Sequence, residues 1–158
     1  GEWCICRQMS GSQRRFWAGG FLYDRGAQAV FLHQRDGNTK INPYRWAFFG
    51  GEGEAGESYL DCFVRELEEE IGLKVSAAQP RKLLDYFYPE RNQQRVVYYV
   101  ESSVPAERLT LGEGAAFAWV GLDRVYELDL ADRTREDLQF FMAHKGAIDS
   151  GRAINKAR

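Results

Sequence analysis

Hydrophobic residues fall in short runs along this chain, and glycine, proline, asparagine or aspartate separates one run from the next. Runs of this kind, rich in aromatic and β-branched residues, are typical of β-strands. The first two runs are joined by Asp24-Arg25-Gly26, which is typical of a turn, so they predict a hairpin. We predict strands over residues 16–23 (with a glycine break), 27–33, 46–49, 82–88, 95–101 and 116–120.

Helical spacing of apolar residues occurs in two further stretches. The first begins after Ser58, a good N-cap with Asp61 where a capping box has glutamate, and it ends at Gly72. The second begins at Asp132 or Thr134. Strands interrupted by two helices indicate an α+β fold or an α/β/α sandwich. The apolar positions are Leu60, Phe63, Val64, Leu67 and Ile71 in the first helix, and Leu138, Phe140, Phe141 and Met142 in the second.

Length and composition indicate one globular domain over residues 1–158, with 44% hydrophobic and 28% charged residues. Residues 1–10 are expected to form an extra strand or an arm, and residues 149–158 a frayed tail. The net charge of −2 argues against nucleic acid as the main partner. No apolar run approaches the roughly 18 residues of a membrane span. Three cysteines do not make a disulfide framework, so we expect a cytoplasmic protein.

The most unusual stretch is an acidic cluster near the end of the first predicted helix. Glu66 lies three and four residues before Glu69 and Glu70, so the three carboxylates share one helix face. Each like-charge pair costs about 0.2–0.5 kcal/mol, and the helix dipole disfavours negative charge at this end. A bound divalent cation would relieve this repulsion, and Mg²⁺ and Mn²⁺ prefer such oxygen ligands.

The cluster belongs to a longer pattern with fixed spacing. Gly51 is followed after five residues by Glu57, and after seven more by Arg65-Glu66-Leu67. One further residue precedes Glu69-Glu70, and another precedes Gly72-Leu73. This stretch resembles the signature of the Nudix hydrolase family, G-x5-E-x7-R-E-U-x-E-E-x-G-U with U aliphatic, at every fixed position.

The flanks of the signature extend the resemblance to MutT-type members of the family. Gln34-Arg35 stands where those sequences have a basic residue at a strand end, and Glu113-Gly114 followed by Trp119 is similar to their downstream residues. One departure is Phe49, because many members have proline before the paired glycines. Phe49 is expected to pack or to line the substrate pocket.

The resemblance implies an α/β/α sandwich with a mixed β-sheet and a Mg²⁺ or Mn²⁺ site. Glu57 is implied as the residue that positions Arg65, which in turn orients the acidic face. The general base is implied to be Glu66 or Glu113. The implied metal ligands are the Gly50 carbonyl, Glu66, Glu69 and Glu70, and the implied substrate contacts are Arg35, Phe49 and Tyr88.

The resemblance implies that this site hydrolyses a diphosphate linkage in a nucleotide by metal-activated water. Within the family, Gln34-Arg35 and the Glu113-to-Trp119 spacing favour a MutT-like nucleoside triphosphate pyrophosphohydrolase. The alternative is a pyrophosphatase for ADP-ribose or nucleotide sugars. A different class, a non-catalytic nucleotide-binding module of the same fold, usually loses signature carboxylates that this chain keeps. The expected partner is a small nucleotide, and the protein is expected to be a monomer or a homodimer.

Overall fold

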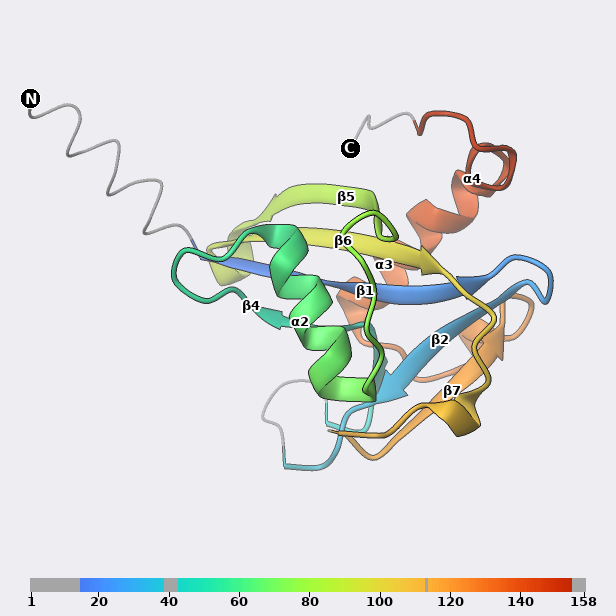
Figure 1. The fold of residues 1–158 in the computed structure, drawn as a ribbon, viewed down its shortest axis with the longest axis horizontal. Helices are drawn as coiled ribbons and strands as arrows, with labels where there is room; N and C mark the ends of the chain where they lie inside the picture. The colour runs from blue at the N-terminus through green and yellow to red at the C-terminus, as the bar shows by residue number, and fades with distance from the viewer. Residues whose placement is uncertain (1–14, 39–42, 113, 155–158) are drawn as a thin grey trace, which may run out of the picture.

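The computed structural model describes residues 15–38, 43–112 and 114–154, and these form a seven-stranded mixed sheet with helices on both faces (Figure 1). The predicted arm at residues 1–10 lies outside the described residues. Within them, no helix is long and apolar enough to cross a membrane. The strands are β1 (Phe16–Asp24), β2 (Ala29–Gln34), β3 (Trp46–Ala47), β4 (Phe49–Glu52), β5 (Arg81–Tyr88), β6 (Gln93–Glu101) and β7 (Ala116–Gly121). The helices are α2 (Tyr59–Ile71), α3 (Asp132–Ala143) and α4 (Lys145–Ser150), with 3₁₀ turns η1 (Pro89–Arg91), η2 (Ala106–Arg108) and η3 (Val125–Glu127).

Strand β1 is the centre of the sheet. One edge pairs in parallel with β6, and the other pairs antiparallel with β4 along its first half and with β2 along its second half. The predicted hairpin is therefore present, and the mixed sheet implied by the resemblance is confirmed. The predicted glycine break is wrong, because β1 runs unbroken through Gly19. A Cβ atom there would lie 2.2 Å from the Phe49 carbonyl oxygen, so glycine lets β4 approach closely.

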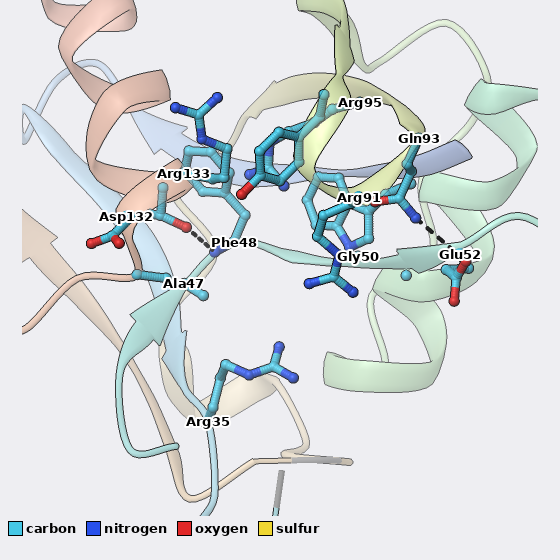
Figure 2. A pocket seen from close by; sticks show the side chains of 15 residues that line it. Arg35, Ala47, Phe48, Gly50, Glu52, Arg91, Gln93, Arg95, Asp132 and Arg133 are labelled. Atoms are coloured by element: carbon cyan, nitrogen blue, oxygen red, sulfur yellow. Dashed lines mark hydrogen bonds between the residues drawn. The ribbon is translucent and has the colours of Figure 1, made fainter. Parts of the chain in front are cut away.

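The single strand predicted over residues 46–49 is two short strands. Strand β3 pairs with β2, whereas β4 pairs with β1, and the change of partner occurs at Phe48. The Phe48 N–H leaves the ladder and donates to Thr134 Oγ1 at 3.4 Å (Figure 2). Because successive side chains of an extended chain point to opposite faces, Phe48 and Phe49 enter different cores.

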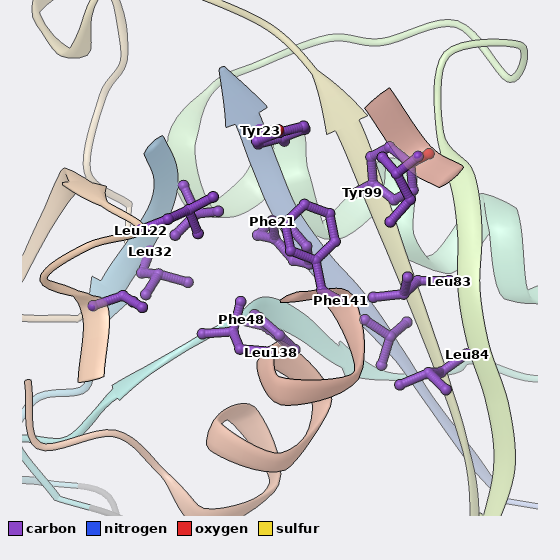
Figure 3. Close-up of a cluster of buried hydrophobic side chains, with 14 of the residues drawn as sticks. Phe21, Tyr23, Leu32, Phe48, Leu83, Leu84, Tyr99, Leu122, Leu138 and Phe141 are labelled. Carbon is purple, nitrogen blue, oxygen red and sulfur yellow. The ribbon is translucent and has the colours of Figure 1, made fainter. Parts of the chain in front are cut away.

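Two hydrophobic cores cover the two faces of the sheet, as the predicted α/β/α sandwich requires. One contains Phe21 and Tyr23, which pack edge-on against Phe141 of α3, and Phe48, which stacks on Phe21 (Figure 3). The other packs the sheet against α2. Its members include Leu22, Phe31, Phe49, Phe63, Leu67, Ile71 and Val96.

Helix α2 has the predicted ends. Ser58 is the N-cap, and its hydroxyl accepts the Asp61 N–H at 3.0 Å. Gly72 ends the helix with φ of +69°, and its N–H donates to the Glu68 carbonyl at 2.9 Å. Cys62 is buried on the core side of this helix as a free thiol. The local sequence therefore positions the acidic cluster on a well-capped helix.

Helix α3 begins at Asp132, one of the two predicted starts, and buries Leu138 and Phe141 more fully than the other apolar residues predicted there. The tail predicted to fray from residue 149 is ordered at its start. Asp149 lies in α4 and accepts hydrogen bonds from the Tyr23 hydroxyl at 2.7 Å and from Lys145 at 2.8 Å. Residues 155–158 lie outside the described residues.

A buried ion pair joins α3 to the sheet. Arg95 Nε of β6 lies 2.8 Å from Asp137 Oδ2, and the Tyr86 hydroxyl of β5 donates to Asp137 Oδ1 at 2.8 Å. Asp137 is fully buried, so both of its oxygens depend on these partners. The carboxylate thereby connects one helix to two adjacent strands.

We predict that Asp137→Asn destabilises the protein by about 3–5 kcal/mol, because it leaves the Arg95 guanidinium buried without its counter-ion. The free energy of unfolding from urea denaturation at pH 7 measures this. Glu127→Gln is the control, since its pair with Arg124 is exposed and is worth about 0–1 kcal/mol. Equal urea midpoints for the two variants would show that the buried pair does not hold α3.

Candidate functional site

The guanidinium of Arg65 gathers the carboxylates of the signature. Its Nε and Nη2 lie 2.7 and 3.0 Å from the two oxygens of Glu57, a bidentate pair. Its Nη1 lies 3.0 Å from Glu66 Oε1 and 3.2 Å from Glu69 Oε2. Hydrogen bonding to Arg65 lowers the pKa of Glu57, which keeps the pair charged near neutral pH. The pairing of Glu57 with Arg65 that the family resemblance implies is present.

Glu70 occupies a different environment from the one its helical position suggests. It is only 3% exposed, because its side chain turns toward β4, where Oε2 accepts the Gly50 N–H at 2.9 Å. Glu66 is hydrogen-bonded to Glu70, so two acidic groups meet at the glycine loop. Burial raises the pKa of Glu66, although the neighbouring Arg65 opposes this shift.

The absence of a side chain at Gly51 leaves room for the Glu66 carboxyl group. A Cβ atom at Gly51 would lie 2.5 Å from Glu66 Oε1. Any larger residue would therefore displace the carboxyl from the β4 backbone. The glycine of the signature is thus required by the packing of an acidic side chain against it.

His33 is a further member of this site that the sequence did not indicate. Its Nε2 lies 3.0 Å from the Phe48 carbonyl oxygen, which makes Nε2 the protonated nitrogen. Its Nδ1 is buried without a hydrogen-bond partner among the described residues and lies 4.0 Å from Glu70 Oε1. Burial lowers the pKa of His33 to about 4, so the ring is neutral at pH 7. A lone histidine inside an apolar strand carried no signal of this placement.

The donor set suits a hard divalent cation. Glu66 and Glu70 supply carboxylate oxygens that repel one another unless a proton or a cation lies near them. Within the described ranges, no three acidic, histidine or cysteine side chains form a ready metal cluster. Arg65 binds both Glu66 and Glu69, and the Glu69 side chain is 57% exposed. Glu113, the other carboxylate implied by the resemblance, lies outside the described residues.

A pocket of about 370 Å³ lies beside this acidic pair, on the α3 face of the sheet (Figure 2). Gly50 and Gly51 form part of its wall, so a single strand, β4, connects the pocket to Glu66 and Glu70. Arg35 and Tyr88, which the resemblance implies as substrate contacts, both line this pocket. The lining residues are Trp17, Arg35, Ala47, Phe48, Gly50, Gly51, Glu52, Tyr88, Arg91, Gln93, Arg95, Ala131, Asp132, Arg133 and Thr134.

The prediction that Phe49 contacts substrate is not supported by its position. Phe49 is completely buried, and its ring stacks on Phe31 and His33 in the α2-side core. Phe48 lines the pocket instead, because the alternation of the chain turns it toward α3. Phe49, which stands where many family members have proline, is therefore a core residue that packs against α2.

Several lining residues were missed or left open by sequence reasoning. From the sequence, Arg91 and Arg95 are as consistent with solvated side chains as with phosphate contacts, and Arg133 at the start of α3 carries no signal. Only the folded topology brings the first turn of α3 next to η1 and β4. The arginine side chains carry no spacing pattern that would reveal this from the sequence.

Comparison with known proteins agrees with this geometry. A family model described as the NUDIX domain matches residues 13–141. The m7GpppN-mRNA hydrolase NUDT17 of Bos taurus is 32% identical over 61% of this chain, but the match spans only 38% of that protein. The nucleoside triphosphatase NudI of an Enterobacter species is 29% identical over 68% of this chain and 83% of that protein.

Among solved structures, a MutT from work on Aliivibrio salmonicida and Vibrio cholerae is similar with a TM-score of 0.67. It is 22% identical, and the match covers 82% of this chain and 98% of that one. At 22% identity, this similarity shows a shared fold and nothing further. With the family model matching most of the chain, and the complete signature assembled around Arg65, the chain is a member of the NUDIX family with a MutT-type fold.

Proposed function

We propose that this protein is a hydrolase that cleaves a diphosphate linkage in a nucleotide. The observation that carries the proposal is the Arg65 network, which holds Glu57, Glu66 and Glu69 together beside the buried Glu70. Gly50 and Gly51, which lie against Glu70 and Glu66, also form part of the wall of a pocket large enough for part of a nucleotide. The NUDIX family and the likeness to NudI, a nucleoside triphosphatase, support the same reaction class.

Four groups are proposed to hold Mg²⁺ or Mn²⁺: the Gly50 carbonyl and the carboxylates of Glu66, Glu69 and Glu70. The bound cation would neutralise phosphate oxygens and lower the pKa of the attacking water. The Gly50 N–H fixes Glu70, and Gly51 leaves room for Glu66, so the backbone of β4 orients both side chains. Glu69 reaches the site by rotating away from Arg65.

The attacking water gives its proton to a carboxylate as its oxygen bonds to phosphorus. Glu66 or Glu113 is proposed as this base. The bond between that phosphorus and the bridging oxygen breaks, and the leaving phosphate departs with the electron pair. Glu57 and Arg65 take no proton in this scheme, because their bidentate pair positions Glu66.

Arg35 and Tyr88 are the proposed substrate contacts. Both line the pocket next to Gly50, where the nucleotide must lie if its diphosphate is to reach Glu66 and Glu70. A nucleoside triphosphate is the preferred substrate, as the MutT-like flanking residues indicate. ADP-ribose or a nucleotide sugar is the alternative.

A panel of nucleoside triphosphates, ADP-ribose and nucleotide sugars, assayed with Mg²⁺ and resolved by chromatography, tests this function. We expect a nucleoside triphosphate to yield a nucleoside monophosphate and pyrophosphate. Turnover of only ADP-ribose or nucleotide sugars would replace the preferred substrate by the alternative. Tight nucleotide binding without turnover of any compound would identify a binding module and refute the hydrolase.

We predict that Glu70→Gln lowers kcat by more than about 100-fold, since it removes a charged ligand from the proposed cation site. The matched control is Glu68→Gln, two residues away on the exposed side of α2, where Glu68 faces Lys74 at 3.7 Å. The control should retain full turnover. Steady-state kinetics at saturating Mg²⁺ compare the two, and near-normal activity of Glu70→Gln would exclude this helix face as the cation site.

Glu57→Gln should weaken the Arg65 network and destabilise the protein by about 1–3 kcal/mol at pH 7. The pKa of Glu57 is lowered in the folded protein, so its contribution exists above the unfolded value and is lost as pH falls through the folded value. The stability difference between wild type and variant should therefore be constant above about pH 5 and shrink below about pH 4. Urea denaturation from pH 7 to 3.5 measures it, and a difference that does not depend on pH would contradict the charged pair.

A further inference from the structure

The pocket presents arginine side chains where a nucleobase site usually presents bare aromatic rings. Four arginines and two acids line it: Arg35, Arg91, Arg95 and Arg133 against Glu52 and Asp132. Ligand pockets are ordinarily apolar with a few polar groups. The chemistry of this lining therefore differs from that of a site built to stack a neutral ring.

Of the three aromatic side chains that line the pocket, Phe48 is only 2% exposed, and Trp17 and Tyr88 each already carry a cation. The Arg95 guanidinium lies 4.1 Å from the centre of the Trp17 ring, and the Arg133 guanidinium lies 4.8 Å from the centre of the Tyr88 ring. The Trp17 ring also packs directly against the β1 backbone at Gly19, where an added Cβ atom would lie 2.3 Å from the ring. A nucleobase would have to displace these contacts in order to stack.

The two acids that line the pocket are paired with cations outside its lining. Glu52 Oε1 lies 2.8 Å from Arg15 Nη2, and Asp132 Oδ1 lies 3.2 Å from Arg45 Nη1. These partners offset the negative charge of the lining, whereas Arg95 and Arg133 are themselves paired, with Asp137 and Glu136. The lining and these ion-pair partners together hold six arginines and four acids, so a ligand meets a net positive charge. Arginine presents planar pairs of N–H donors that match phosphate oxygens.

Arg35 and Arg91 come from opposite sides of the opening. Arg35 follows β2 and Arg91 belongs to η1, and their guanidinium groups point toward the same space next to Gly50 (Figure 2). Gly50 in turn donates its N–H to Glu70. A phosphate chain whose scissile linkage lies at Glu66 and Glu70 would thus continue between these two arginines.

We propose that this arginine pocket, formed by Arg35, Arg91, Arg95 and Arg133 with Trp17 and Tyr88, binds an anionic phosphoryl group beyond the scissile diphosphate. The inference rests on the proposed function and narrows its substrate class. Nucleotides with a third phosphate, such as nucleoside triphosphates and dinucleoside polyphosphates, fit the pocket. Nucleotide sugars, in which a neutral sugar follows the diphosphate, lack the group that the arginines recognise.

Binding of two analogues that differ by one phosphate tests this without turnover. Calorimetry with α,β-methylene-ADP and α,β-methylene-ATP, each with Mg²⁺, should show at least about 10-fold tighter binding of the triphosphate analogue. Arg91→Gln and Arg133→Gln should each cut this advantage to less than about 3-fold, with melting temperatures recorded for both. Arg124→Gln, in an exposed pair outside the pocket lining, should preserve the full ratio.

Equal affinity of the wild-type protein for the two analogues would overturn the anionic pocket, even if nucleotides are hydrolysed. An undiminished ratio in both Arg91→Gln and Arg133→Gln would also overturn it. A clear preference for the triphosphate analogue that depends on these arginines, in a protein that hydrolyses nothing, would support the pocket and reject the proposed hydrolase. The two claims therefore fail separately.

Discussion

The interaction on which the site depends is the set of hydrogen bonds made by the Arg65 guanidinium. One side of it binds both oxygens of Glu57, which lies in the loop before α2, and the other side reaches Glu66 and Glu69 on the helix. A single cation thus fixes the loop to the helix and offsets the repulsion among the signature carboxylates. If Arg65 were lost, Glu57 and Glu66 would both be left mostly buried and without their counter-charge.

The second constraint is the change of strand partner at Phe48. Because β3 pairs with β2 and β4 with β1, the chain turns Phe48 toward α3 and Phe49 toward α2. The same short segment then supplies Gly50, which borders the pocket and donates to Glu70. Strand β4 therefore separates the acidic pair from the arginine pocket. The positions of both depend on the register in which β4 pairs with β1.

The features that were predicted correctly from the sequence are those that residues close together in the chain determine. The caps of α2 and the hairpin of β1 and β2 follow from residues close together in the sequence, and the pairing of Glu57 with Arg65 follows from the resemblance to the family. Features that depend on contacts between residues far apart in the chain were not predicted. Periodicity placed Glu70 on an open helix face, yet the Gly50 N–H draws it into the interior. The burial of Phe49 and the arrival of Arg133 at the pocket depend likewise on strands and helices distant in the chain.

The central claim is that the carboxylates of Glu66, Glu69 and Glu70 and the Gly50 carbonyl form one divalent-cation site. The most direct measurement is anomalous X-ray scattering from crystals soaked in Mn²⁺. The account predicts a Mn²⁺ peak bonded to the Gly50 carbonyl oxygen and to Glu66 and Glu70, at distances near the roughly 2.0–2.2 Å typical of small divalent cations. A peak only at exposed surface acids, with Glu66 and Glu70 unligated, would contradict it.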